Sequence, residues 1–230
     1  MRTAIGWAVG LALLGAAISP TAHAQRTAEA FLYDDEHDGA VRATVEMDPA
    51  LAVGVGYVRA VDVSVGRFHR RLGVHLDATA IIGFSSWDFA GGVSMHLAEG
   101  AGFNALATID LELKVVQNDV HTGVAYGYSA AVRPGWFDPA WYLALDVGLH
   151  GTIATTLVHR GAYRERFPNV ADGTYVTDNL SFFLGGVVGF RIERVVLVGL
   201  RFAWRFPRTF ETYAPYFQPY TIDVEVGARF

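Results

Sequence analysis

The last nine residues, 222–230, read IDVEVGARF and alternate strictly between two kinds of side chain. Every even position is apolar, whereas the odd positions carry Asp, Glu, Gly and Arg. Successive side chains of a β-strand point to opposite faces, so this segment predicts a strand with one apolar and one polar face.

The same alternation recurs along the chain, without a helical period of useful length. Charged residues fall on the polar face of these segments, and the apolar face carries only Arg59. The further strands are predicted at about 41–47, 51–66, 72–84, 87–97, 103–115, 120–133, 141–157, 180–193 and 196–206.

The composition narrows the class of protein. The 230 residues are 52% hydrophobic and 18% charged and include no cysteine, which excludes a disordered chain, a disulfide scaffold and a cysteine-ligated metal site. A net charge of −5 argues against a nucleic-acid partner. The mean hydropathy is high, +0.26, yet no apolar run after residue 24 is long enough for a spanning helix.

The first 24 residues have the features of a bacterial export signal. Arg2 precedes an apolar stretch over 5–18, Pro20 breaks it, and the tripeptide 22–24 fits the small-x-small cleavage rule. We therefore expect a signal peptide over 1–24, cleaved after Ala24; a single spanning anchor is the alternative. Residues 25–40 are then expected to be a periplasmic segment, followed by a β-domain over 41–230.

Alternation alone also fits a soluble sandwich or barrel, so strand length and aromatic placement decide. Strands of roughly ten to sixteen residues suit a tilted membrane crossing. Aromatic residues gather near strand ends at two levels, as at two lipid–water interfaces. They are Trp136, Phe137 and Trp141 at one level and Phe84, Trp87, Phe89, Trp204, Phe206 and Phe210 at the other.

These features predict an all-β protein, a closed antiparallel transmembrane barrel, with a secreted soluble barrel as the alternative. The terminal segment ending in Phe230, with apolar residues at 222, 224, 226 and 228, resembles the last strand of bacterial outer-membrane β-barrels. In general architecture the chain is similar to the compact OmpA/OmpX-like proteins. The resemblance implies an outer-membrane location, contact with lipid and lipopolysaccharide, and a role for Phe230 in the signal read by the barrel-assembly machinery.

Connection lengths predict ten strands, with eight as the alternative. Short periplasmic turns are expected at 67–71, 98–102, 134–140 and 193–195, and outer connections at 84–87, 116–120, 158–179 and 207–217. Residues 41–66 would add a first hairpin that closes through Asp48 and Pro49. Arg59 conflicts with a lipid-facing position, so either a bulge near 58–60 turns it inward or a hairpin lies there.

The inward face supplies long side chains of both signs. A barrel of eight to ten strands is barely wider inside than the side chains that fill it, and confined charges are expected to pair. Arg201 and Arg205 are expected beside Asp223 and Glu225. The predicted luminal charge network comprises Asp110, Glu112, Lys114, Arg133, Asp146, Arg191, Arg201, Arg205, Asp223, Glu225 and Arg229.

No set of residues predicts catalysis, a cofactor or a metal. Asp119 and His121 form an isolated pair, and the acidic run 34–38 is interpreted as a solvated segment. The cluster Phe68-His69-Arg70-Arg71 suits either a solvated turn or anionic headgroups. The outer loop 158–178 offers candidate contacts to sugar phosphates or a partner protein, with an ordinary solvated loop as the alternative. Those candidates are Arg160, Tyr163, Arg164 and Arg166.

The sequence thus predicts a monomeric, non-enzymatic outer-membrane barrel that acts structurally or through its outer loops. A narrow pore or transporter for small solutes is the alternative, and a membrane-embedded hydrolase is a third reading. Small inward residues at 123, 125, 127, 129 and 131 favour the pore, because they leave room beside the charges.

Overall fold

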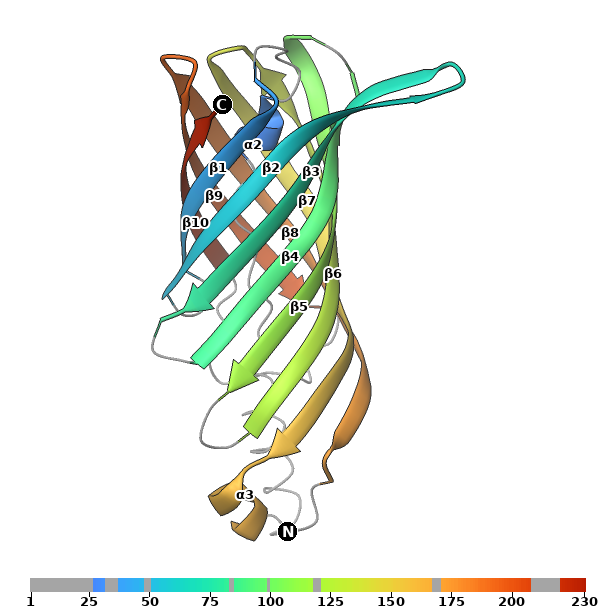
Figure 1. The fold of residues 1–230 in the computed structure, drawn as a ribbon, viewed down its shortest axis with the longest axis vertical. Coiled ribbons are helices and arrows are strands. Elements are labelled where there is room, and N and C mark those ends of the chain that lie inside the picture. The colour runs from blue at the N-terminus through green and yellow to red at the C-terminus, as the bar shows by residue number, and fades with distance from the viewer. Residues whose placement is uncertain are drawn as a thin grey trace.

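A computed structural model of the chain describes residues 27–31, 37–47, 51–82, 85–98, 100–117, 121–166, 171–207 and 220–230. They form one closed barrel in which each strand pairs with its neighbours in the chain and the first strand pairs with the last (Figure 1). All pairings are antiparallel. The prediction of ten strands is confirmed; the eight-strand alternative is wrong, because 39–47 and 51–65 complete the ring.

The strands are long, as alternating sequences of this length allow. Two short helices, α2 (Thr27–Ala30) and α3 (Gly161–Arg166), lie outside the sheet. The strands are β1 (Gly39–Met47), β2 (Leu51–Val65), β3 (Phe68–Ile81), β4 (Ser85–His96), β5 (Gly102–Gln117), β6 (His121–Phe137), β7 (Trp141–His159), β8 (Gly173–Ile192), β9 (Val196–Pro207) and β10 (Tyr220–Arg229).

Within the described part of the chain, neither helix has the length or apolar character needed to cross a membrane.

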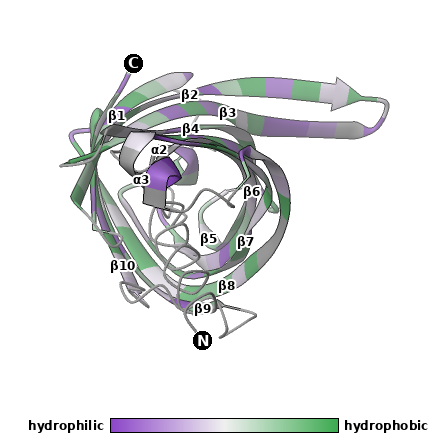
Figure 2. Cartoon of the chain, turned by 90° about the horizontal axis from the view of Figure 1, so that it is seen from below, coloured by the Kyte–Doolittle hydropathy of each residue, from purple (hydrophilic) through white to green (hydrophobic). Residues whose placement is uncertain are grey.

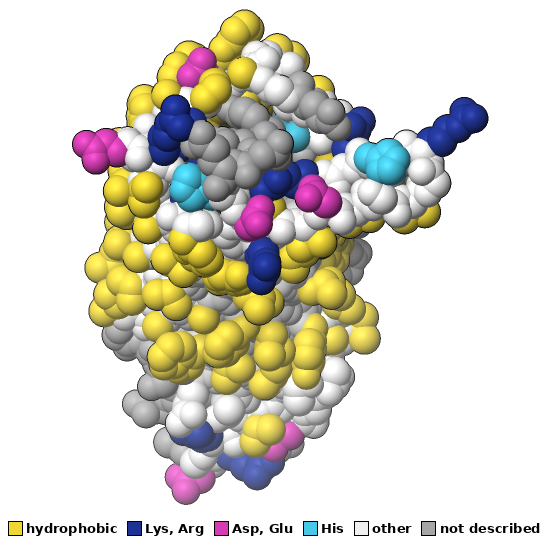
Figure 3. All heavy atoms as spheres, turned by 45° about the horizontal axis from the view of Figure 1, so that its top comes forward, with side chains coloured by type: hydrophobic (Ala, Val, Ile, Leu, Met, Phe, Trp, Pro, Cys, Tyr) yellow, Lys and Arg dark blue, Asp and Glu magenta, His cyan; other side chains and the backbone are white. Residues whose placement is uncertain are grey.

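The alternation in sequence becomes an apolar outside and a charged inside. Val55, Phe103 and Leu111 keep about two thirds or more of their surface exposed on the outer face (66%, 75% and 67%). On the face seen in Figure 3, hydrophobic side chains form an apolar belt across the wall. Figure 2, which looks along the barrel, shows apolar and polar residues alternating in the strands of the wall.

The barrel has two unlike rims. The terminal rim, at the top of Figure 1, carries the start of β1, the end of β10 and the short turns around 66–67, 97–101, 138–140 and 193–195. The loop rim, at the opposite end, carries the connections that follow β1, β3, β5, β7 and β9. The predicted periplasmic turns and the predicted outer connections therefore lie at opposite ends of one barrel.

Three predicted connections are shorter than expected. Residues 134–137 belong to β6, so the turn expected at 134–140 is confined to 138–140. Residues 68–71 belong to β3, so the turn there is only Gly66 and Arg67. The outer loop 158–178 is strand at both ends, since β7 continues to His159 and β8 begins at Gly173. Pairing continues past a register shift between Thr152 and Ala154, and the β-branched residues that follow Gly173 favour strand there.

The expected bulge at Arg59 is wrong. Register runs without interruption through Arg59, which pairs with Gly39 on one side and Val74 on the other. Arg59 is exposed on the outer face, at the rim where β1 begins. A rim position lets a long arginine side chain reach polar surroundings, so no inward turn is needed.

The predicted aromatic levels hold with one correction. Trp136 and Trp141 are exposed near the terminal rim. Phe137 is wrongly assigned to the outer face: it is buried in the lumen and stacks on Tyr142 with ring centroids 5.5 Å apart. Because neighbours in a strand point to opposite faces, the outward Trp136 directs Phe137 inward. Phe84 and Phe210 lie outside the described residues, and the exposed aromatics toward the loop rim are Trp87, Phe89, Trp204 and Phe206.

The two ends of the sheet meet at Gly39 and Phe230. Each donates its backbone N–H to the other's carbonyl, at 3.0 and 3.3 Å. The Phe230 ring, on the outer face, stacks near Tyr57 of β2 with centroids 6.3 Å apart. The terminal residue therefore completes the ladder that closes the barrel.

The turn between β8 and β9 stores backbone strain. Glu193 and Arg194 have φ values of 50° and 63°, and the Val195 N–H donates to the Ile192 carbonyl at 3.2 Å. Positive φ at both central positions is typical of a type I′ turn, which favours Asn-Gly. Left-handed backbone costs a residue other than Gly or Asn about 1 kcal/mol.

We predict that Glu193→Asn combined with Arg194→Gly stabilises the barrel by about 1 kcal/mol, because the replacements relieve left-handed strain without a change of register. Urea unfolding followed by tryptophan fluorescence measures the difference. The control is Asp138→Asn with Ala140→Gly in another turn of the terminal rim, where neither residue has positive φ. Equal or lower stability of the 193/194 variant would contradict the assignment of left-handed backbone strain to this turn.

Candidate functional site in the lumen

The polar face of the sheet lines the inside of the barrel. The predicted network residues on this face are all buried except Arg191, which is half-buried. Lys114, Arg205, Glu225 and Arg229 are among the buried ones. Charges confined in this way are stabilised only when they pair or accept hydrogen bonds, so their partners determine what the lumen can do.

Asp146 on β7 is the centre of one chain of ion pairs. Its Oδ1 accepts from Nε of Arg133 at 2.7 Å, and its Oδ2 accepts from Nε of Arg201 at 2.5 Å. Arg201 also donates from its NH1 to Asp223 Oδ2 at 2.8 Å. The Arg201 guanidinium lies over the ring of Phe183, 5.1 Å from the centroid. These contacts join β6, β7, β8, β9 and β10 across the inside of the wall.

The pairing of Arg201 with Asp223 matches the expectation from neighbouring strands. The contact of Arg201 with Asp146 was not expected, because β8 lies between their strands. An arginine is long enough to reach past one strand when the inward residue there is small, and Gly185 is the inward residue of β8 that pairs with Asp146.

A second set of contacts includes a residue outside the sheet. Glu29 of α2 accepts from NH1 of Arg42 at 2.8 and 2.7 Å, and Asp77 on β3 accepts from the other side of the same guanidinium at 2.6–2.9 Å. The side chains of Glu29 and Arg42 are 0% and 1% exposed. A buried glutamate between barrel strands and a helix fixes that helix inside the lumen.

Histidines extend the network. His75 Nε2 lies 2.6 Å from Asp110 Oδ1, and Ser129 donates to Asp110 Oδ2 at 2.9 Å. His75 also lies near Glu29, with Nδ1 3.6 Å from Oε1. His150 on β7 makes a similar contact, because its Nε2 lies 2.7 Å from Oε2 of Glu112 on β5. Asp110 and Glu112, which alternation places on one face, therefore bind different histidines.

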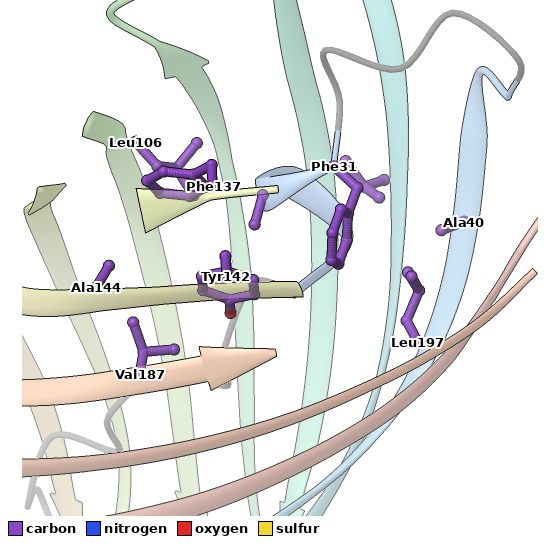
Figure 4. Close-up of a cluster of buried hydrophobic side chains, with 10 residues drawn as sticks. Phe31, Ala40, Leu106, Phe137, Tyr142, Ala144, Val187 and Leu197 are labelled. Carbon is purple, nitrogen blue, oxygen red and sulfur yellow. The ribbon is translucent and has the colours of Figure 1, made fainter. Parts of the chain in front are cut away.

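Helix α2 occupies the mouth of the barrel at the terminal rim, beside β4, β9 and β10. The described part of the expected periplasmic segment 25–40 thus lies partly within the lumen. The next residue, Phe31, packs edge-on against Tyr142 with centroids 5.8 Å apart, in the cluster drawn in Figure 4. Arg191 lies over the Phe31 ring at 5.6 Å, and His96 bonds the Ala30 carbonyl at 2.9 Å.

Sequence reasoning missed part of this network. Arg42 and Asp77 stand at inward positions, so alternation could have found them. His75 and His150 are also inward, but a neutral imidazole gives no charge signal. Glu29 had no sequence signal, because it lies in a segment without strand alternation, and only the folded chain brings it to Arg42.

Of the four predicted loop contacts, the structure describes the side chains of two. Arg160 and Arg164 are exposed at the loop rim, whereas the side chains of Tyr163 and Arg166 lie outside the description. Arg164 forms an ion pair with Asp172. Asp172 also accepts hydrogen bonds from the backbone N–H of His159, at 2.8 Å, and from its ring, at 2.9 Å. The contact from the backbone N–H, followed by that from the ring, lowers the pKa of Asp172 below its ordinary value.

The remaining candidates do not gather into a site. Asp119 and residues 34–36 lie outside the described chain, as does the side chain of His121. Among the described residues, no group of three or more His, Asp or Glu side chains could hold a metal ion. Carboxylates held between arginines and histidines form fixed charge pairs, an arrangement typical of a structural network.

Two solved structures with some similarity to this chain come from autotransporters. The beta domain of the Bordetella autotransporter BrkA is 12% identical, with 85% of this chain and 99% of that chain covered and a TM-score of 0.44. The translocator domain of autotransporter NalP from Neisseria meningitidis is 11% identical, with 86% and 91% covered and a TM-score of 0.36. No protein-family model and no curated protein matches the chain.

We predict that Asp146→Asn lowers the free energy of unfolding by about 3–5 kcal/mol, because it leaves two buried arginines without their shared counter-charge. Urea unfolding in lipid vesicles, followed by tryptophan fluorescence, measures the loss. Asp62→Asn is the matched control, since Asp62 is exposed and exposed pairs contribute about 0–1 kcal/mol. Similar losses in the two variants would show that Asp146 is not the centre of the network.

We predict that the loop after β7 loosens in acid. A lowered folded pKa means that Asp172 stabilises the loop above its ordinary value of 3.8 and loses this effect as pH falls through the folded pKa. The chain has no cysteine, so a spin label at Gly161→Cys reports on the loop alone. The label should stay immobile down to pH 3.8 and become mobile only in more acid solution. In an Asp172→Asn background it should be mobile at neutral pH. A label with equal mobility in both backgrounds would contradict the role of Asp172 in holding the loop.

Proposed function

We propose that this protein is an integral outer-membrane β-barrel whose lumen is largely filled by its own side chains, and that it acts structurally or through its outer loops rather than as an enzyme. The observations that support the proposal are two sets of ion pairs inside the lumen. Ion pairs centred on Asp146 join the strands of one side, and Glu29 fixes α2 in the mouth through Arg42.

The membrane location rests on the outer face. A closed barrel satisfies the backbone hydrogen bonds of its strands internally, which a lipid environment demands. The belt between two levels of exposed aromatics is apolar, as expected for hydrocarbon flanked by two interfaces. The terminal rim is assigned to the periplasm and the loop rim to the exterior, because short turns and both termini are periplasmic in such barrels.

Assembly and partners follow from the same placement. Phe230 is assigned as part of the signal read by the barrel-assembly machinery, on the resemblance of the last strand. Lipid and lipopolysaccharide surround the barrel, which is proposed to be a monomer. Exposed Arg160 at the loop rim supports a surface that binds sugar phosphates, since arginine pairs well with phosphate oxygens.

A narrow pore is the second candidate. Gly123, Ala125 and Gly127 on β6 are inward residues with little or no side chain, so this stretch of wall adds little to the filling of the lumen. The two candidates differ in one measurable property, which is steady ion conductance through the folded protein.

We predict that the wild-type protein forms no stable channels in planar bilayers. Glu29→Gln, which removes the counter-charge that holds α2 to Arg42, should raise the frequency of open events at least several-fold. Glu193→Gln is the matched control, because Glu193 is exposed in a turn of the same rim. Heat-modifiable migration in cold SDS gels verifies that each sample is folded.

Stable wild-type channels of defined conductance that change with Arg201→Ala would overturn the filled lumen and favour the pore. Silent traces from both glutamate variants would show that α2 does not close the mouth.

A further inference from the structure

Strands β2 and β3 continue beyond the barrel as a two-stranded ribbon, which we call the rim hairpin and define as residues 60–72. β1 begins opposite Arg59, and β4 pairs with β3 only from Leu72 onward. From Val61 to Arg71 the two strands therefore pair only with each other. Figure 1 shows the ribbon leaving the terminal rim sideways, and Figure 2 shows it extending away from the wall.

A tight turn makes the ribbon regular to its tip. Val65 pairs with Phe68 across Gly66 and Arg67, and Gly66 has a φ of 61°. A glycine with positive φ at the first central position is typical of the type II′ turn that joins β-strands. The two faces of the ribbon are therefore set by strand alternation along its whole length.

One face of the rim hairpin continues the outer face of the barrel and carries three valines, with Arg70 opposite the middle one, Val63. Val61, Val63 and Val65 share the parity of the outward residues Val55 and Tyr57 on the same strand. Val61 and Val65 are 41% and 70% exposed. A wall that bends outward over its rim turns its outer face back toward the belt. Figure 3 agrees, because hydrophobic side chains show along the lower border of the ribbon, toward the belt.

The opposite face is polar and held to the barrel. Ser64 and His69 pair across the strands with Oγ and Nδ1 2.8 Å apart. Arg71 donates to Asp38 Oδ1 at 2.9 Å and to the His37 carbonyl at 3.1 Å. The Ser64–His69 contact lies near the tip, whereas the Arg71 contacts lie at the base and hold the ribbon to the barrel.

The ribbon and its base are basic. Between 59 and 71 there are four arginines against one acidic residue, Asp62. Arg59 and Arg67 are exposed, one at the base and one at the tip. Anionic headgroups attract such charges at a membrane surface, and long arginine stems let apolar neighbours enter the interface.

We propose that the rim hairpin is a membrane-surface anchor that lies flat on the leaflet at the terminal rim. Its valine face enters the lipid interface, and Arg59 and Arg67 bind the phosphates of anionic phospholipids. The inference rests on the proposed membrane location of the barrel. Its support is the continuity of the valine face with the outer belt and the match of basic side chains to phosphate.

The test uses the full chain folded into vesicles of phosphatidylcholine, with or without about one third phosphatidylglycerol. An environment-sensitive fluorophore is attached at Val65→Cys, at Ser64→Cys or at Leu111→Cys, the last as a reporter on the exposed belt. Brominated lipids then quench any label that contacts lipid. We expect quenching at 111 in both membranes, at 65 at least twofold more than at 64, and more at 65 when phosphatidylglycerol is present. Arg67→Gln should remove that last increase.

Each outcome decides a separate statement. Absence of quenching at 111 would overturn the membrane barrel itself. Quenching at 111 with none at 65 would overturn the anchor and favour a protein partner on the free strand edges, which remain able to pair. Equal quenching at 64 and 65 would also overturn it, because a ribbon lying flat exposes one face only.

Discussion

The structure depends on the closure of its sheet. Reciprocal backbone bonds between Gly39 and Phe230 join β1 to β10, so the sheet has no free edge along the wall. Closure fixes one side of every strand as inside and the other as outside. The two-residue alternation then determines which side chains lie on the outer face and which enter a confined space. A slip by one residue would reverse every position, so the strict alternation specifies register throughout the wall.

Closure also determines the chemistry of the lumen. Charges that would be solvated on an open sheet are brought within a few ångströms of one another, where an unpaired charge is costly. Asp146 shows how this is solved, because each carboxylate oxygen accepts from a different arginine. Glu29 has the same role from outside the sheet. The network therefore joins strands that share no backbone hydrogen bonds. It also fixes α2 inside the mouth.

The sequence predicts the strands of the wall far better than the side-chain contacts in the lumen. The ten strands and their inward charges follow from alternation, which is local. The position of Phe137 was wrong because aromatic clustering was given more weight than the parity set by Trp136. Arg59 was misplaced because strand limits, and with them distance from the rim, are not encoded in alternation. The contacts of Glu29 and the reach of Arg201 past β8 depend on three-dimensional proximity, which no spacing along the chain reveals.

The two rims of the barrel are stabilised in different ways. At the loop rim, Asp172 gathers His159 and Arg164, so a connection between long strands is held by polar contacts at its base. At the terminal rim the turns are tight and α2 occupies the mouth, yet β2 and β3 extend past their neighbours. The free strand edges of a two-stranded ribbon can pair with other chains unless the edges are covered or carry charges. Its arginines and outward bend are consistent with lipid as the cover, since lipid shields the apolar face while the charged side remains in water.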